Sequence, residues 1–373
     1  MSVDAEAKTA NTADPVAWFK SEKRFLGVLS LSVVVAFVAA PSPHIAMWVG
    51  FCFAAYSAIA NDSIQTLGTF IASNRGRAWW QLWLFVGGIF VATMSASWLM
   101  YDGDVSHQRL LAKGFETAPS EFHVLQLLAP LALVFLTRLR MPVSTTFLLL
   151  SCFAASGKSL GAVITKSLSG YSIALVCSLI LWGVLGTWMH KRFQGKAHPG
   201  WRVMQWITTG CLWSVWLMQD AANIAVYLPR SLSALELIAF LSVPVLGLGF
   251  MFRMGGEKIQ EVVNEKASVV DVRAATVIDF LYAVILYVFK IQSNVPMSTT
   301  WVFVGLLAGR ELAMTWRKVA GEDRTMAHAA KLVGRDLAYV TIGFLISLAI
   351  ASGVNPAIGS ALFVVGTLWS MVA

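Results

Sequence analysis

The chain has 373 residues, of which 57% are hydrophobic and only 13% are charged, whereas soluble domains carry about 25% charged residues. Its mean hydropathy is +0.68 and long apolar stretches recur along it, which excludes an ordinary soluble domain and indicates a polytopic helical membrane protein. The net charge of +8 comes mainly from short segments between these stretches, where basic residues set membrane topology. We therefore expect the lipid bilayer, and not nucleic acid, as a partner.

The N-terminal segment, residues 1–24, mixes acidic and basic residues and is predicted to be disordered and cytoplasmic. The apolar stretch that follows, 25–40, ends in small residues that resemble a signal-peptide cleavage site. Its polar lead is too long and too acidic for a signal peptide. We therefore expect this stretch to be a retained first helix.

Twelve apolar stretches are predicted to be membrane spans. They are residues 25–40, 45–73, 78–101, 123–139, 141–157, 170–188, 205–229, 232–252, 273–290, 295–312, 334–352 and 355–373. Several are short and lie beside prolines, which makes them candidates for re-entrant hairpins that do not cross. The predicted fold class is thus an all-α polytopic membrane protein with about twelve spans.

The distribution of basic residues fixes the predicted orientation. With the N-terminus inside, most of the 28 Lys and Arg residues fall in inner segments. The predicted outer segments hold only Arg109, Lys113, Lys158, Lys166, Arg230 and Lys290. This asymmetry follows the positive-inside rule, so both termini of a multi-pass protein are predicted to be cytoplasmic.

Two short polar motifs each occur twice in the chain, in the same order. NDSIQ (61–65) and QDAAN (219–223) share the pattern amide–Asp–x–x–amide at an offset of 158 residues. MPVSTTF (141–147) matches VPMSTTW (295–301) at an offset of 154 residues. Two motifs in one order at nearly one spacing indicate an internal repeat.

The two copies of the repeat are predicted to be inverted relative to each other. In the predicted topology the two copies of each motif cross the membrane in opposite senses, as in transporters that place their sites at the interface of inverted repeats. We therefore predict a first repeat half at 25–190 and a second at 205–373, joined by a basic cytoplasmic linker at 191–204.

The first motif pair has the chemistry of a cation site. A helix brings positions i and i+3 to one face, so Asp62 and Gln65 are expected to converge, as are Asp220 and Asn223. A carboxylate among amide oxygens suits Na⁺, with Asp62 and Asp220 as the metal candidates, while a carboxylate alone is able to carry a proton. Polar contact between helices is the alternative. The predicted cation-binding residues are Asn61, Asp62, Gln65, Gln219, Asp220 and Asn223.

The Ser-Thr-Thr motifs have the opposite chemistry. Pro142 and Pro296 suit a helix start, and Ser144 or Ser298 just beyond is able to act as an N-cap. Hydroxyls and free backbone N–H groups at the positive end of a helix form an anion site, with ordinary capping as the alternative. The predicted substrate-binding residues are Ser144, Thr145, Thr146, Ser298, Thr299 and Thr300.

One further carboxylate, Asp279, falls within the predicted span 273–290. An ionisable residue inside a span is expensive and needs a partner or a task. We expect Asp279 to lie near the inner surface and to pair with a basic residue. A proton carrier is the alternative.

Taken together, these motifs resemble those of the PiT family of inorganic phosphate transporters, which carries GANDVANxFGT-like and PVSTTH-like motifs in each of two inverted halves. ANDSIQTLGTFIAS (60–73) aligns with the first motif without gaps, and MQDAANIAVYLP (218–229) keeps Asp220 and Asn223. The Ser-Thr-Thr core is intact in both copies. The chain differs from the family pattern at Gln65, Gln219, Val226, Phe147 and Trp301.

The resemblance covers roughly 45–190 and 203–352 and implies uptake of inorganic phosphate coupled to Na⁺ or H⁺, by a protein that is not an enzyme and has no cofactor apart from the coupling ion. Na⁺ is favoured because amide oxygens bind metal cations and do not store protons. A sulfate or other oxyanion permease of the same fold, a passive anion channel and a transport-dead sensory relative stay open. The short link between the halves points to a bacterial inner-membrane protein, and a homodimer is left open.

Overall fold

The computed structural model describes residues 20–74, 76–139, 141, 143–153, 159–254, 271–293, 297–318 and 325–355. These residues form helices and connecting turns, and no strand occurs among them. Most of the predicted disordered segment 1–24, and all but the first residue of the predicted span 355–373, lie outside the described residues.

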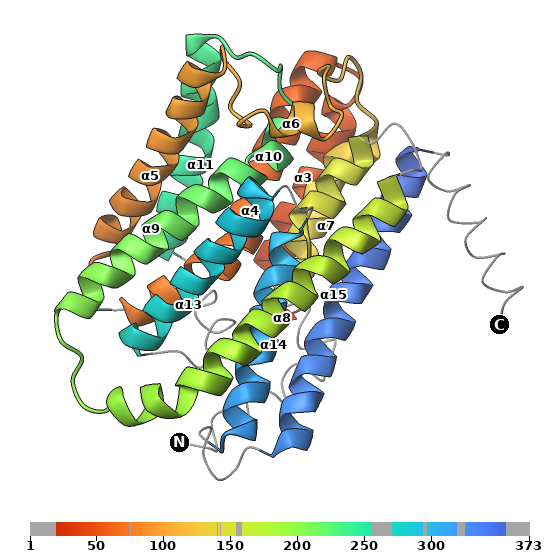
Figure 1. The fold of residues 1–373 in the computed structure, drawn as a ribbon. Coiled ribbons are helices and arrows are strands. Elements are labelled where there is room, and N and C mark those ends of the chain that lie inside the picture. The colour runs from red at the N-terminus through yellow and green to blue at the C-terminus, as the bar shows by residue number, and fades with distance from the viewer. Residues whose placement is uncertain are drawn as a thin grey trace, which may run out of the picture.

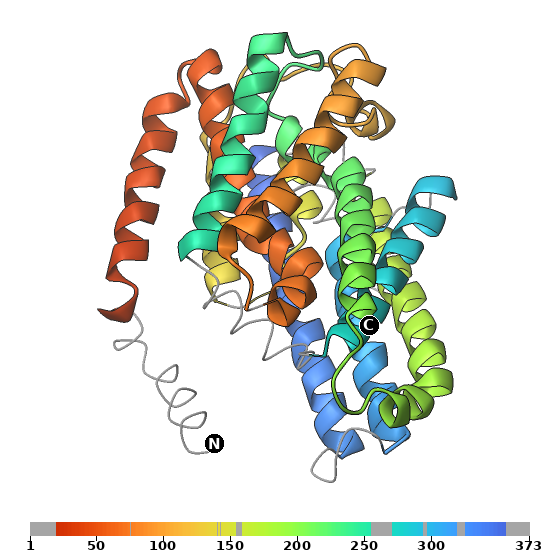
Figure 2. The same ribbon diagram turned by 90° about the vertical axis from the view of Figure 1, so that its left-hand side faces the viewer.

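The helices are arranged in a bundle whose long members lie side by side (Figures 1 and 2). In chain order they are α3 (Lys23–Ala39), α4 (Pro43–Ser73), α5 (Trp79–Met100), α6 (Arg109–Ala112), α7 (Val124–Arg138), η1 (Thr146–Leu150), η2 (Ser151–Phe153), α8 (Ser159–Arg192), α9 (Gly200–Asp220), α10 (Ala222–Ala225), α11 (Ala234–Met254), α13 (Val272–Ile285), η3 (Leu286–Gln292), α14 (Thr299–Trp316) and α15 (Met326–Val354).

The outer faces of the bundle are apolar. Val38 on α3, Val184 on α8 and Leu235 on α11 are each about two-thirds or more exposed, which suits contact with lipid and not with water. Six stretches are long and apolar enough to cross a membrane, namely Pro43–Asp62, Trp79–Met100, Ser169–Met189, Ala234–Arg253, Val272–Phe289 and Met326–Val354. The chain is thus an all-α, multi-pass membrane protein, as predicted, while the count of about twelve spans stays a prediction.

Helix α4 continues unbroken through its polar cluster. Pro43 occupies its first turn, where a missing N–H costs nothing, and the helix ends at Ser73, well beyond Asp62. The segment predicted as span 141–157 is different, because in its described part it forms the π-helical turns of η1 and the 3₁₀ turn η2, not one α-helix. Such π-helical turns frequently occur at functional sites.

Helices α4 and α9 cross in opposite directions. Near the end of α4, the Asn74 amide donates to Gln205 Oε1 at 3.0 Å, close to the start of α9. Farther along both helices, Thr69 and Thr209 bond to the same carboxylate, that of Asp279. Residue numbers therefore fall along α4 as they rise along α9, which brings the two polar motifs together.

The two predicted halves are interleaved. Helix α8 packs along α14, and α15 packs against η1 and η2. The approach of α14 to α8 depends on Gly305 and Gly309, because a Cβ at either position would lie 2.5 Å from a backbone oxygen, that of Tyr171 or Leu175. Small residues at this spacing let membrane helices pack backbone to backbone.

Candidate functional site

The carboxylate of Asp62 is held by the first Ser-Thr-Thr segment. Thr145 Oγ1 donates to Asp62 Oδ1 at 2.8 Å and to Oδ2 at 2.9 Å. Asn61 Nδ2 donates to Asp62 Oδ1 at 3.0 Å and to the Val143 carbonyl at 2.8 Å. Asp62 is 1% exposed. A buried carboxylate on α4 is thus tied to the start of η1 by hydroxyl and amide donors.

The next hydroxyl along the chain reaches the second aspartate. Thr146 Oγ1 donates to Asp220 Oδ1 at 3.3 Å, and Asn223 Nδ2 donates to Thr146 Oγ1 at 3.1 Å. Asp220, at the end of α9, is buried. Two consecutive threonines of one motif therefore bridge the two Asp motifs, which lie on helices of opposite direction.

The second Ser-Thr-Thr segment meets the first directly. Ser298 Oγ donates to Ser144 Oγ at 3.0 Å, and Thr300 Oγ1 donates to the Val143 carbonyl at 3.3 Å. The Thr299 carbonyl accepts from the hydroxyl of Tyr282 at 3.0 Å. All four segments singled out in the sequence thus come together, and all twelve predicted residues except Thr146 are buried.

The predicted capping is found only in part, since Ser144 lies one residue before Thr145, the N-cap of η1. The Phe147 N–H donates to Ser144 Oγ at 3.4 Å, as in a cap. Ser298 precedes α14 in the N-cap position, but its side chain makes no capping bond because its hydroxyl is turned toward Ser144. Pro142 and Pro296, predicted to start these helices, lie outside the described residues.

Three amide oxygens of the site have no hydrogen-bond donor within the part of the chain that the structure describes. They are Gln65 Oε1, Gln219 Oε1 and Asn223 Oδ1, all buried. Buried polar atoms are otherwise almost always paired, so these oxygens indicate a binding site for a ligand. Oxygen atoms beside carboxylates are what a hard cation binds.

Asp279 has different partners from those expected from the sequence. It is 1% exposed and accepts from Thr69 Oγ1 at 2.5 Å and from Thr209 Oγ1 at 2.6 Å. The expected pairing with a basic residue is wrong, because its hydrogen-bond partners among the described residues are these two hydroxyls on α4 and α9, while its place near the inner surface stays a prediction. The 3.6-residue period of α13 turns Asp279 to the helix interface.

Arg109 is a residue that the sequence analysis did not connect with the site. It begins the short helix α6 between α5 and α7, and its guanidinium lies within electrostatic range of Asp220. Burial lowers the pKa of Arg109, and the charge of Asp220 opposes that effect. Its Nε has no hydrogen-bond partner among the described residues. A four-residue helix is too short to carry a periodicity that would have indicated this position.

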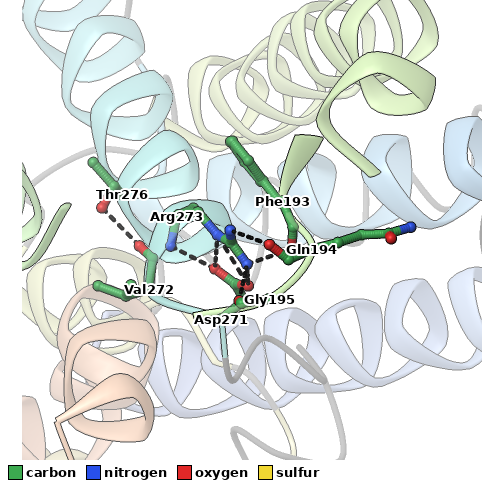
Figure 3. A network of polar contacts seen from close by, with 7 residues as sticks. All are labelled: Phe193, Gln194, Gly195, Asp271, Val272, Arg273 and Thr276. Carbon is green, nitrogen blue, oxygen red and sulfur yellow. Dashed lines mark hydrogen bonds and ion pairs between the residues drawn. The ribbon is translucent and has the colours of Figure 1, made fainter. Parts of the chain in front are cut away.

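At the opposite end of the bundle, Arg273 closes the start of α13 against the α8–α9 connection (Figure 3). Its guanidinium donates to both carboxylate oxygens of Asp271, with Nε 3.0 Å from Oδ1. It also donates to the carbonyls of Phe193, Gln194 and Gly195. The donors of the buried guanidinium are thus used to fix this connection.

The comparisons with known proteins add no relative from which a role could be read. No protein-family model matches the chain, and no match is found among curated proteins or among solved structures.

Proposed function

We propose that the protein is a secondary transporter that couples uptake of inorganic phosphate to inward movement of Na⁺. The observation that carries the proposal is the set of three buried amide oxygens without donors, Gln65 Oε1, Gln219 Oε1 and Asn223 Oδ1, beside the carboxylates of Asp62 and Asp220. A purely structural polar cluster leaves few such atoms unpaired.

The charge of the two buried aspartates supports a cation-binding half of the site. Asp62 and Asp220 both lie within electrostatic range of the Tyr282 hydroxyl, so two buried carboxylates share one region. Burying two like charges is costly unless positive charge balances them, and Arg109 lies within electrostatic range of Asp220. Na⁺ bound to carboxylate and amide oxygens supplies that charge, and it leaves the region able to accept an anion.

The hydrogen-bond donors of the two Ser-Thr-Thr segments support an anion-binding half of the site. Ser144 and Ser298 present hydroxyls to each other from two different segments, and α14 begins at Thr299 with backbone N–H groups that no earlier turn of the helix can pair. A helix start and several hydroxyls are an oxyanion site. Phosphate would displace the Ser144–Ser298 bond and accept from both groups.

The arrangement also fits alternating access. The antiparallel α4 and α9 each carry one Asp motif, and η1 and α14 each begin with one Ser-Thr-Thr motif. Sites of this kind lie between inverted repeats, and rocking of one repeat against the other exposes them to each side in turn. The predicted site residues are almost all buried here, which supports an occluded arrangement of the proposed site.

The test is uptake of radiolabelled phosphate into proteoliposomes with Na⁺ and pH gradients imposed separately. We expect inward Na⁺ to drive uptake, Asp62→Asn and Asp220→Asn to reduce it to background, and Asp102→Asn to leave it unchanged. Asp102 is an exposed loop residue at φ 48°, a conformation that asparagine tolerates. Phosphate flux without any ion dependence would identify a channel, and uptake of sulfate alone would identify a different permease.

A further inference from the structure

Asp279 forms a second polar centre that the proposed site does not use. Each of its carboxylate oxygens accepts one threonine hydroxyl, Oδ1 from Thr69 at 2.5 Å and Oδ2 from Thr209 at 2.6 Å. The two threonines come from α4 and α9, and Asp279 comes from α13. Three helices that carry or flank the main site are therefore joined at one buried acid.

No cation balances this acid among the described residues. Among the described residues, its hydrogen-bond partners are the hydroxyls of Thr69 and Thr209. On its own helix, Arg273 is engaged by Asp271 and Tyr282 is bonded to the Thr299 carbonyl. On α4 the charged residue nearest in sequence to Thr69 is Asp62, which is itself acidic, and on α9 the one nearest to Thr209 is Arg202, which is exposed. A buried carboxylate in this setting needs a positive partner.

The geometry selects a proton as that partner. Both hydroxyl oxygens already lie at hydrogen-bond distance from the carboxylate, so hydrogen atoms occupy the lines between them. The amide oxygens without donors among the described residues belong to the two Asp motifs, and none belongs to a residue that bonds to Asp279. The main site thus offers metal ligands, whereas the Asp279 centre offers none beyond its own hydrogen-bonded pair.

We propose that Asp279, together with Thr69 and Thr209, is a proton-binding site that makes transport respond to pH. When a proton binds, an O–H bond forms on one carboxylate oxygen and the adjacent threonine accepts from it. That threonine then turns its own hydrogen to a carbonyl one turn back along its helix, as Thr66 Oγ1 does to the Asp62 carbonyl at 2.7 Å. The centre is hydrogen-bonded in both protonation states, with no other atom transferred.

Further polar side chains lie between this centre and the end of the bundle that holds the α8–α9 connection. Gln205 donates to Ser73 and accepts from Asn74 Nδ2 at 3.0 Å. These side chains lie one turn beyond Thr69 on α4 and one turn before Thr209 on α9. A shift of α4 against α9 would therefore alter both the contacts of these polar side chains and the main site.

The first test does not depend on transport. Infrared difference spectra of the purified protein, recorded while the pH is stepped, should contain the C=O stretch of a buried carboxylic acid that Asp279→Asn removes. The substituted amide would still bond to both threonines, so the variant is expected to fold, which size-exclusion chromatography checks. Thr209→Val should keep the band but move its frequency, because the acid loses one partner. A wild-type protein without this band, or a band that survives in Asp279→Asn, would overturn the proposal.

The second test concerns coupling and rests on the proposed function. In proteoliposomes at fixed Na⁺, wild-type uptake should change several-fold with the pH on one side, and Asp279→Asn should flatten that profile while keeping the Na⁺ dependence. An unchanged pH profile in Asp279→Asn would overturn the coupling. A protein that binds the proton but transports nothing would leave the proton site standing and would refute the proposed function alone.

Discussion

Thr145 donates its single hydroxyl hydrogen to both carboxylate oxygens of Asp62, at 2.8 and 2.9 Å, across 83 positions of sequence. The contact joins a residue predicted to bind the anion to a residue predicted to bind the cation. Binding of a cation in one half of the site should therefore change the affinity of the other half for the anion. A cation that takes over Asp62 frees the Thr145 hydroxyl for an oxyanion, which gives a physical basis for ordered binding.

Thr145→Val and Thr299→Val should separate the two halves of the site. Each substitution removes a hydroxyl at nearly constant volume. Loss of a hydrogen bond to a charged group costs about 1.5–3 kcal/mol, or roughly tenfold or more in affinity. Thr145→Val should raise the concentrations of both Na⁺ and phosphate needed for half-maximal uptake, because it also releases Asp62.

Thr299 makes no side-chain hydrogen bond to either carboxylate within the described part of the chain, so Thr299→Val should affect phosphate alone. Initial rates measured over a grid of Na⁺ and phosphate concentrations give, for each variant, the Na⁺ and phosphate concentrations needed for half-maximal uptake. The same response of both variants would contradict a division of the site into a cation half and an anion half.

Arg109→Gln should weaken capture of phosphate from the side of the membrane that α6 faces. Arg109 is a half-buried cation whose charge is felt at Asp220, and cationic residues at a site mouth raise the local concentration of anions. The apparent affinity for phosphate is expected to fall several-fold at low ionic strength and less at high salt. Arg109→Lys, which keeps the charge, is the control, and an equal loss in both variants would point to packing.

Arg273→Lys should lower the stability of the protein in detergent. The lysine keeps the charge but cannot reproduce the planar donor set that holds Asp271 and three carbonyls (Figure 3). A thermal shift assay should show a clear decrease in the melting temperature. Arg202→Lys, at an exposed position of α9, should leave it unchanged. Equal melting temperatures for Arg273→Lys and the wild type would show that the α8–α9 connection does not depend on this network.

The sequence predicted the membrane class and the twelve candidate site residues because hydropathy and motif repetition are properties of the chain itself. It could not predict that Thr145 and Thr146 would divide between Asp62 and Asp220, since that depends on how η1 sits between α4 and α9. It also predicted the wrong partner for Asp279, because a span boundary does not say which neighbours a helix face meets. Arg109 was missed for a related reason, as a four-residue helix carries no periodic signal.

Gln65→Met tests whether the unpaired amide oxygen of Gln65 is a ligand of the cation. Methionine keeps the length of the side chain but removes Gln65 Oε1, which has no donor among the described residues. The melting temperature in Na⁺-free buffer should therefore change little, since no hydrogen bond of that oxygen is lost. The rise in melting temperature on adding Na⁺ should shrink, because a ligand stabilises the folded state in proportion to its binding, by about 2.7 kcal/mol at a hundred times its Kd.

Gln126→Met is the matched control for that experiment. Gln126 is also a buried glutamine, but both ends of its amide are in use. Its Nε2 donates to the Cys152 carbonyl at 2.9 Å, and its Oε1 accepts from the His123 N–H at 2.8 Å. This variant should lose stability in Na⁺-free buffer, because two partners are left unpaired, and yet keep the full Na⁺-induced rise. If Gln65→Met behaves in the same way as Gln126→Met, Gln65 is a structural residue, and the cation site must be assigned to Asp62 and Asp220 without it.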